Sequence, residues 1–266
     1  MRNVLKAKHY NSQSQWMEVW NNYKEYRTPE EIDLLIKETV HEIKTVCTGK
    51  SAAYAWSGGK DSIALQIVCE EAGIKRGFCC YNNLYFTDSI KFFFANRPEG
   101  VTMWDSGEDE RWLAQHPRFL FPKGVAHHWN VQTHLRYQPI YCAKNKIDIL
   151  MMGKRTQDGN FVSHELVYTN GKGVSVYCPI RNWKHEDVIC AIRYRNKNLS
   201  PLYFTENGFH YGDTKFAVMS PTKGETVSDA WARIYKIEPE KVVRSAEAGI
   251  PSAIAYLKSR ARGAYD

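Results

Sequence analysis

The hexapeptide 57–62, Ser-Gly-Gly-Lys-Asp-Ser, holds the residue types in this chain that are best suited to bind an anion. Two consecutive glycines let the backbone take conformations that other residues avoid, so its N–H groups can approach a ligand closely. Ser57 and Ser62 can donate hydroxyl hydrogen bonds, and Lys60 supplies a positive charge. These features predict a turn that binds pyrophosphate. The pattern is not a Walker A loop, which has a longer spacing between its first glycine and its Gly-Lys pair.

The elements around the hexapeptide decide whether its N–H groups can act together. A short apolar stretch at 52–56 predicts a buried strand before it, and Ala64, Ile67, Val68 and Ala72 mark one side of a helix after it. The start of a helix adds unpaired N–H groups and about half a positive charge. A second strand is expected at 77–81, which completes a βαβ unit and predicts a parallel sheet. The alternative, a turn that merely connects strand and helix, does not account for the complete hexapeptide.

Other patterns extend this α/β arrangement along the chain. Thr28, Pro29 and Glu31 form the capping box of a first helix. Asp148–Met152 is apolar almost throughout, as expected of a central strand. Further strands are predicted at 100–104 and 175–178, and further helices at 87–95, about 124–146, about 184–196 and about 251–262.

Four more segments accompany the loop: Tyr141-Cys142-Ala143-Lys144-Asn145-Lys146, Gly153-Lys154-Arg155, the stretch 179–188 (Pro-Ile-Arg-Asn-Trp-Lys-His-Glu-Asp-Val) and Pro201-Leu202-Tyr203. With these motifs the chain resembles the ATP pyrophosphatase (adenine nucleotide α-hydrolase, PP-loop) superfamily over about residues 50–205. Within it, the motifs resemble the phosphoadenosine phosphosulfate (PAPS) reductase branch, which includes the small subunit of ATP sulfurylase. The loop is the most specific of these motifs.

The resemblance implies a Rossmann-like (HUP-type) parallel sheet with helices on both faces and an adenine nucleotide at the carboxyl ends of the strands. It implies ATP with Mg2+ as cofactors, and attack at the α-phosphorus to give an adenylylated acceptor and pyrophosphate. It assigns catalytic roles to Lys60, Asp61 and Arg155. It assigns nucleotide binding to Ser57, Gly58, Gly59, Lys60, Asp61, Ser62, Asp88 and Gly153. For Asp88, the cap of a helix is an equally good interpretation.

Two departures from the family pattern concern the second substrate. The reductases carry a nucleophilic cysteine in a Glu-Cys-Gly-x-His tail, whereas the last cysteine here is Cys190 and none follows it. Reduction by that mechanism is therefore disfavoured, and Cys142 is the substitute that remains, with a buried, inert thiol as the simpler interpretation. Thr156-Gln157-Asp158-Gly159 also differs from the residues that usually follow the family's Gly-x-Arg, so the acceptor stays open.

Metal and nucleic-acid sites have weaker signals. His127, His128 and His134 with Cys142 match no zinc spacing, and surface histidines are the simpler explanation. The acidic run 105–110 could hold Mg2+, although a solvated loop is favoured, so metal ligands stay unassigned. Basic residues in the last part of the chain could follow a nucleic-acid backbone, with a solvated helical face as the alternative. These residues are Arg233, Lys236, Lys241, Arg244, Lys258, Arg260 and Arg262.

Composition sets the outer limits. The chain has 266 residues, 43% of them hydrophobic, and a net charge of +7, which favours partners that carry phosphate. No apolar run is long enough to span a bilayer and no signal peptide is evident, so a cytoplasmic protein without membrane partners is expected. Seven cysteines without a C-x-x-C pair predict reduced thiols. Three parts are predicted: an N-terminal helical extension (1–27), a nucleotide-binding α/β core (28–205) and a mixed or helical C-terminal segment (206–266), with a homo-oligomer possible.

These observations favour an enzyme that binds ATP and cleaves its α–β phosphate bond to activate an acceptor, in sulfur transfer or in modification of a nucleotide or nucleic acid. Two alternatives remain. One is a PAPS or adenylyl-sulfate reductase or sulfotransferase that uses Cys142 as its thiol. The other is a nucleotide- or nucleic-acid-binding module of the same fold without turnover.

Overall fold

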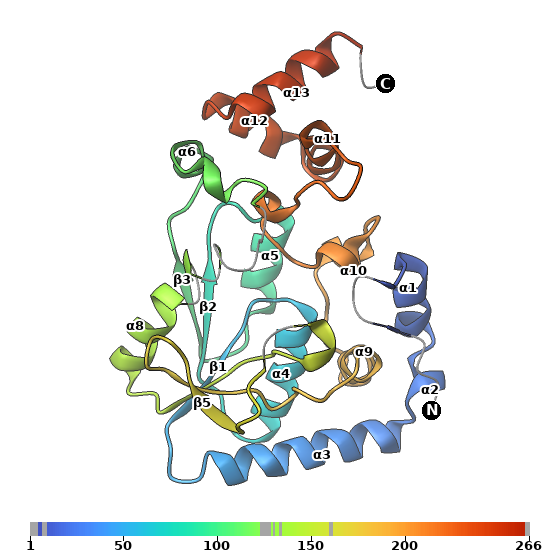
Figure 1. Cartoon of the computed structure of the whole chain (residues 1–266). Coiled ribbons are helices and arrows are strands. Elements are labelled where there is room, and N and C mark those ends of the chain that lie inside the picture. Colours follow the sequence, from blue (N-terminus) through green and yellow to red (C-terminus); the bar gives the residue numbers. More distant parts are fainter. Residues whose placement is uncertain are drawn as a thin grey trace.

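A mostly parallel sheet forms the centre of the molecule (Figure 1). The computed structural model describes residues 5–6, 10–122, 129, 131–132, 135–159 and 162–263. Over these residues the sheet has six strands in the order β3-β2-β1-β4-β6-β5, and only β5 runs antiparallel to its neighbour. The strands are β1 (Ala52–Ala55), β2 (Gly77–Tyr81), β3 (Val101–Asp105), β4 (Ile149–Met151), β5 (Val167–Thr169) and β6 (Ser175–Tyr177). The predicted strands are confirmed, whereas β5 was not predicted because it is short and only partly buried.

The parallel register brings the carboxyl ends of the central strands to one edge. Ala53 of β1 pairs with Leu150 of β4, and Ala55 pairs with Phe78 of β2. The residues that follow β1, β2 and β4 therefore leave the sheet on the same side. In open α/β sheets this side is where ligands bind. The predicted Rossmann-like α/β class is confirmed.

The two faces of the sheet carry separate apolar layers, because successive side chains of a strand point in opposite directions. Ala53, Phe78, Leu150 and Val176 pack with α8 (Leu135–Asn145) on one face. The alternate residues of the same strands face a larger cluster on the other side that includes α4 (Lys60–Glu71) and α9 (His185–Tyr194). Helices thus cover both faces, as predicted.

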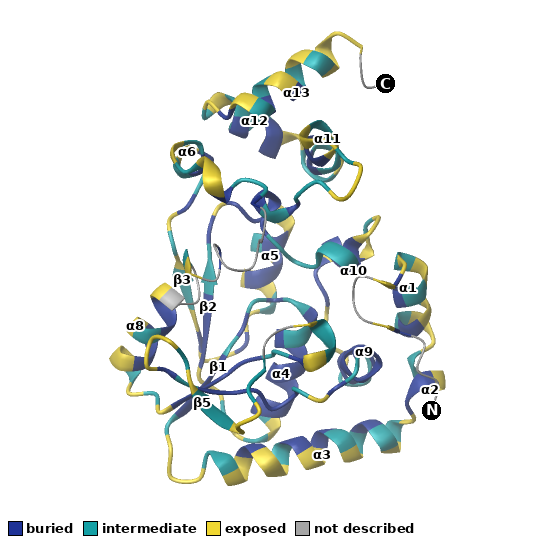
Figure 2. Ribbon diagram, in the orientation of Figure 1, coloured by how far each residue is buried: buried dark blue, intermediate teal, exposed yellow. Residues whose placement is uncertain are grey.

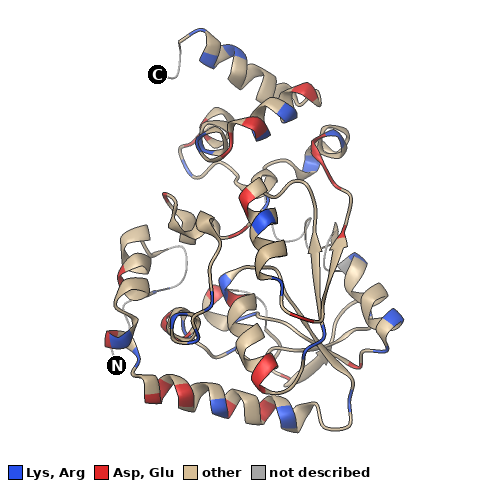
Figure 3. Cartoon of the chain, turned by 180° about the vertical axis from the view of Figure 1, so that it is seen from behind, with Lys and Arg blue, Asp and Glu red and all other residues tan. Residues whose placement is uncertain are grey.

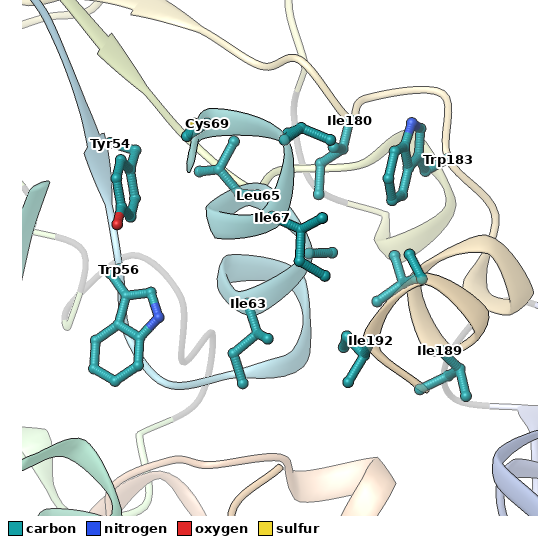
Figure 4. Packing of buried hydrophobic residues seen from close by; sticks show 14 of the residues in the cluster. Tyr54, Trp56, Ile63, Leu65, Ile67, Cys69, Ile180, Trp183, Ile189 and Ile192 are labelled. Atoms are coloured by element: carbon teal, nitrogen blue, oxygen red, sulfur yellow. The ribbon is translucent and has the colours of Figure 1, made fainter. Parts of the chain in front are cut away.

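Helix α4, which begins directly after the glycine turn, lies between β1 and α9 (Figure 4). Trp56, at the end of β1, faces one side of it, and Ile189 and Ile192 of α9 lie on the other. The sequence predicted a helix with one apolar side, and this is wrong. Every residue from Ser62 to Cys69 is buried (Figure 2), because the sheet and α9 cover α4 from two directions.

The N-terminal elements wrap the outer side of this layer. Helix α3 (Pro29–Val46) begins with the predicted capping box, in which Thr28 and Glu31 each accept a hydrogen bond from the other's backbone N–H. It packs against α4 and α9, as do α1 (Gln13–Asn21) and α2 (Tyr23–Tyr26) against α9. The N-terminal extension is therefore attached to the same helix that covers α4.

The C-terminal part forms three helices that stand beyond the edge of the core (Figure 1). Helices α11 (Val227–Ile237), α12 (Pro239–Glu247) and α13 (Pro251–Ala261) share a second apolar cluster with Leu84, Phe86 and Leu113. Only α13 was predicted individually. The remaining described elements are α5 (Thr87–Asn96), α6 (Glu110–Gln115), η2 (Pro117–Phe119), η4 (Thr156–Asp158), η5 (Pro201–Phe204), α10 (Gly208–Tyr211) and η6 (Phe216–Val218).

The acidic run 105–110 is not the solvated loop that was favoured. Glu108 is buried and accepts hydrogen bonds from Asn82 Nδ2 at 2.9 Å and from Gln132 Nε2 at 2.5 Å. Glu110 is also buried, and its Oε1 lies 3.3 Å from Lys241 Nζ of α12. These carboxylates connect the core to the C-terminal helices, so their charge is used within the fold.

Two further expectations can be compared with the described residues. None of their helices is both long and apolar enough to cross a membrane. All seven cysteines are free thiols, and five of them are buried, which fits the prediction of reduced cysteines.

Candidate functional site

The glycine turn bends sharply between β1 and α4. Gly58 has φ +70°, a conformation that residues with a side chain rarely adopt. A Cβ at this position would lie 2.6 Å from ring carbons of Phe93, which belongs to α5. A glycine is therefore required here both by the backbone conformation and by the ring against it.

Ser62 closes the turn from the first turn of α4. Its Oγ donates to the carbonyl of Gly59 at 2.8 Å and accepts from the backbone N–H of Ser57 at 3.1 Å. Ser57 Oγ donates to the same oxygen at 3.3 Å. The two hydroxyls, expected to donate to phosphate, thus hold the turn in shape.

The N–H groups of the turn have different environments. The N–H of Lys60 donates to the phenolic oxygen of Tyr203 at 2.9 Å. For the N–H groups of Gly59 and Ser62 the described residues provide no hydrogen bond. Both lie at the start of α4, where a helix has no carbonyl partners for them. Tyr203 belongs to the Pro-Leu-Tyr motif, so two motifs that the sequence singled out meet at this turn.

Lys60 and Arg155 lie in one buried network of ion pairs. Lys60 Nζ lies 2.7 Å from Asp61 Oδ2 and 3.7 Å from Asp158 Oδ1. Arg155 Nε lies 2.7 Å from Asp61 Oδ1, and its Nη2 lies 2.8 Å from Asp158 Oδ2. Both cations are almost fully buried, and two carboxylates balance their charge.

This geometry differs from the expectation that Lys60 and Arg155 face the phosphates. Arg155 Nη1 also donates to the carbonyl of Trp183 at 3.0 Å, and Nη2 lies 3.0 Å from His185 Nδ1. Because a guanidinium only donates, His185 Nδ1 must be the acceptor. The network therefore fastens the loop after β4 to the stretch 179–188 and to α4. Asp158 was not predicted to take part in the site.

Gly153 allows the segment after β4 to approach the turn closely. A Cβ on Gly153 would lie 2.8 Å from the carbonyl oxygen of Asp61. The segment 153–155 therefore packs directly on the first turn of α4. This place beside the loop agrees with the resemblance.

The N-terminal extension reaches the same place through Trp16. Lys60 Nζ lies 5.7 Å from the centre of the Trp16 ring, and that ring stacks on Phe209 at 5.1 Å. Gln13 Nε2 donates to the carbonyl of Tyr203 at 2.8 Å. Trp16 of the extension thus lies beside Lys60 of the turn, a contact that sequence patterns did not show.

Two predicted residues lie elsewhere. Cys142 is buried on α8, on the other face of the sheet, and burial raises the pKa of its thiol to about 11. The interpretation as an inert thiol is favoured by this environment. Asp88 does not cap its helix, because the N-cap of α5 is Phe86. Its side chain is largely exposed, 3.4 Å from Lys91 Nζ, and it lines a pocket with Leu202 and Arg233.

The candidate metal and nucleic-acid residues are only partly placed. His127, His128 and His134 lie outside the described residues. Among those described, no group of three or more His, Cys, Asp or Glu side chains is placed to hold a metal ion.

The basic residues of the C-terminal part mix with acidic ones on its helices (Figure 3). Four of them form ion pairs with carboxylates, which reduces the positive charge left for a nucleic acid. The pairs are Arg233 with Glu225, Lys236 with Glu206, Lys241 with Glu110, and Arg244 with Glu238.

No protein-family profile matches the chain, and no curated protein does either. Among solved structures, it is similar to a PAPS reductase from Candida auris in complex with phosphate, with 14% identity, 66% of this chain and 90% of that one covered, and a TM-score of 0.45. It is similar to an NH3-dependent NAD synthetase from Campylobacter jejuni, with 15% identity, 87% of this chain and 94% of that one covered, and a TM-score of 0.45. It is also similar to an NMN synthetase from Francisella tularensis, with 15% identity, 80% of this chain and 95% of that one covered, and a TM-score of 0.48.

Proposed function

We propose that this chain binds ATP at the turn 57–62 and cleaves the bond between its α- and β-phosphates to adenylylate an acceptor. One observation carries the proposal. The N–H groups of Gly59 and Ser62, which have no hydrogen bond within the described part of the chain, lie at the start of a buried helix at the carboxyl edge of a parallel sheet. Such N–H groups bind phosphate well, since the helix dipole also favours negative charge there.

In this proposal the turn is held ready by its neighbours. Ser62 and Tyr203 fix the backbone, and Arg155 and Lys60 fix Asp61 beside it. Lys60 and Arg155 then act as positioning residues: they hold Asp61 and the turn in place and do not contact the phosphates themselves. A rigid turn lowers the barrier because its dipoles need not reorganise as charge moves to the leaving pyrophosphate.

Magnesium fits this site as part of the substrate. Both oxygens of Asp61 already contact cations, and Asp158 is shared between Arg155 and Lys60. Mg2+ that arrives with ATP would keep phosphate oxygens and water as most of its ligands, as it commonly does. Its chemistry would be to neutralise charge on the pyrophosphate.

The proposal also concerns the type of reaction that the acceptor undergoes. Activation of an acceptor is favoured over PAPS reduction, because Cys142 lies on the far face of the sheet with a thiol pKa of about 11. A thiol with so high a pKa supplies little thiolate at neutral pH. Sulfur transfer and modification of a nucleotide or nucleic acid both remain compatible with an adenylylated intermediate.

Gly58→Ala tests the nucleotide site. We expect it to weaken ATP binding at least 10-fold, since the new methyl group meets the Phe93 ring and moves the turn. Gly73→Ala is the matched control, at the other end of α4, with φ +85° and no heavy atom within 4 Å of the new Cβ. Both variants carry the strain of a positive φ, about 1 kcal/mol, so a difference in ATP affinity reports on the turn itself.

The measurements are calorimetric titration with Mg·ATP and release of AMP and pyrophosphate from α-labelled ATP. Wild-type protein that binds no ATP, or equal affinities in the two variants, would refute the turn as the nucleotide site. Binding without AMP formation, in the presence of any acceptor tried, would leave the alternative of a binding module without turnover.

A further inference from the structure

The segment Gly212–Phe216 crosses the carboxyl edge of the sheet between α10 and η6. Lys215 forms an isolated antiparallel bridge with Tyr85, and the N–H of Phe216 donates to the carbonyl of Leu84 at 3.0 Å. The segment is thereby fixed beside the end of β2.

Asp213 in this segment presents a buried carboxylate that forms no ion pair with a described residue. Both carboxylate oxygens are buried, and neither has a hydrogen-bond partner in the described part of the chain. The hydroxyls of Ser89 in α5 and Ser200 before η5 are also buried without partners there. Both hydroxyls lie close enough to the carboxylate to lower the pKa of Asp213. Buried polar atoms in native proteins are nearly always paired, so such a group points to an absent ligand.

Lys215 is buried beside it and lacks a carboxylate partner. Its Nζ donates to Tyr85 Oη at 3.0 Å and lies 4.3 Å from the centre of that ring and 5.3 Å from the Trp129 ring. No ion pair within 4.0 Å joins Lys215 to Asp213 or to any other carboxylate of the described residues. Lys60 and Arg155, by contrast, are each paired with two carboxylates. Lys215 therefore keeps a charge that a ligand can use.

Tyr203 connects this segment to the glycine turn. Burial raises the pKa of the Tyr203 phenol, and the backbone N–H groups of Lys60 and Asp213 act in the opposite direction. Only the N–H of Lys60 is within hydrogen-bond distance of this phenolic oxygen among the described residues. Lys215 Nζ donates to Tyr85 Oη, and the Tyr85 ring lies 5.1 Å from the ring of Phe93, which packs against Gly58 of the turn. The carboxylate and the ammonium thus lie in the neighbourhood of any phosphate bound by the turn.

We propose that Asp213 and Lys215 form the reaction end of the site, where Lys215 binds a phosphate oxygen of ATP and Asp213 accepts the proton of an attacking amine or hydroxyl group. Ser89 and Ser200 would orient that group by hydrogen bonds. The inference rests on the proposed cleavage of ATP and adds to it the chemical class of the acceptor and two catalytic residues.

The step balances as follows. The amine nitrogen or hydroxyl oxygen of the acceptor forms a bond to the α-phosphorus, and the bond from that phosphorus to the bridging oxygen breaks. Pyrophosphate leaves with the electron pair of the broken bond. The proton of the attacking group moves to a carboxylate oxygen of Asp213, and no oxidant or reductant is needed.

The protonation of the two groups agrees with these roles. Burial raises the pKa of Asp213 to about 7, and Ser89, Ser200 and Lys215 only partly offset it. Burial lowers the pKa of Lys215 to about 8, and Cys80, Glu108, Cys79 and Asp213 raise it in part. A carboxylate poised near neutral pH is well matched to the work of a general base. The expected rate therefore rises with pH through about 7 and falls above about 8.

The test follows the conversion of α-labelled ATP between pH 5.5 and 9.5, to AMP with water as the acceptor and to the adenylylated adduct with added hydroxylamine. Asp213→Asn should lower kcat about 100-fold and remove the acid limb of the profile, with ATP affinity unchanged within about 2-fold. Lys215→Met should remove the alkaline limb and weaken ATP binding about 10-fold. Exposed Glu240→Gln and Lys223→Met are matched controls and should retain the wild-type profile.

Distinct results would overturn the proposal. An Asp213→Asn variant with the wild-type rate and acid limb would exclude the proton acceptor. If high Mg2+ concentration restored its activity, Asp213 would be a metal ligand instead. If wild-type protein forms neither AMP nor the adenylylated adduct, that outcome refutes the proposed ATP cleavage itself and this inference with it.

Discussion

Arg155→Met is expected to lower the free energy of unfolding by about 3–5 kcal/mol, the usual cost of removing one partner from a buried ion pair. Arg155 is fully buried, and its loss removes one of the two cations that pair with Asp61 and Asp158 among the described Lys and Arg side chains, the other being Lys60. The carbonyl of Trp183 also loses its donor. Urea unfolding followed by circular dichroism measures the difference.

Arg195→Met provides the matched control. Arg195 also contacts two carboxylates, Asp33 at 3.0 Å and Glu71 at 2.8 Å, but about a quarter of its side chain is exposed to water (28%). Ion pairs that water reaches contribute at most about 1 kcal/mol, so this variant should be much less affected. Equal losses in the two variants would show that the Arg155 network does not stabilise the fold.

The same variant separates two roles for Arg155. A positioning residue should affect ATP binding through the shape of the turn, so Arg155→Met combined with Asp158→Asn should recover part of the stability and part of the ATP affinity. If Arg155 instead contacts phosphate directly, ATP affinity should fall equally in Arg155→Met and in the double variant. The result decides whether Arg155 acts as the family resemblance implies or as the geometry indicates.

The parts of the fold that local patterns determine could be predicted from the sequence. The capping box of Thr28 and Glu31 requires only residues three apart, and the strand before the hexapeptide requires only its own apolar run. The glycine turn and its motif partners 153–155 and 201–203 were also identified, and they meet around α4. The parallel pairing of β1 and β2 follows from the βαβ unit because parallel strands need a crossover helix, whereas the order of all six strands was not predicted.

The partners of the charged groups could not be predicted in this way. The charge of Lys60 suggests a phosphate contact until the fold brings Asp158 within 3.7 Å of it. Glu110 seemed solvated because Lys241, which pairs with it, lies 131 residues further along the chain. Asp213 and Lys215 carry no motif, and only the tertiary structure shows that the carboxylate oxygens of Asp213 and the side chain of Lys215 are buried. Charge partners across elements depend on three-dimensional packing, which periodicity does not encode.

Asp213→Asn is expected to stabilise the protein, increasingly so as the pH rises. The folded state raises the pKa of Asp213 from 3.8 to about 7, so it keeps a proton that the unfolded chain releases. The stability that this proton provides is complete below about pH 4 and is lost as the pH rises to about 7. At about 1.4 kcal/mol per pKa unit, the ionised carboxylate costs roughly 4 kcal/mol at pH 8, and asparagine avoids that cost. Lys215 titrates near pH 8, so the comparison is cleanest between pH 4.5 and 7.5.

Urea unfolding of wild type and Asp213→Asn across that range measures the difference, and Asp88→Asn serves as the exposed control. Asp88 lies in the first turn of α5, where a carboxylate contributes at most about 1 kcal/mol, so its variant should be slightly less stable at every pH. A pH-independent difference for Asp213→Asn would mean that the carboxylate is not buried in the folded protein. A stabilised variant that also loses ATP cleavage would mean that the protein keeps a costly ionised group where its chemistry requires one, as functional sites often do.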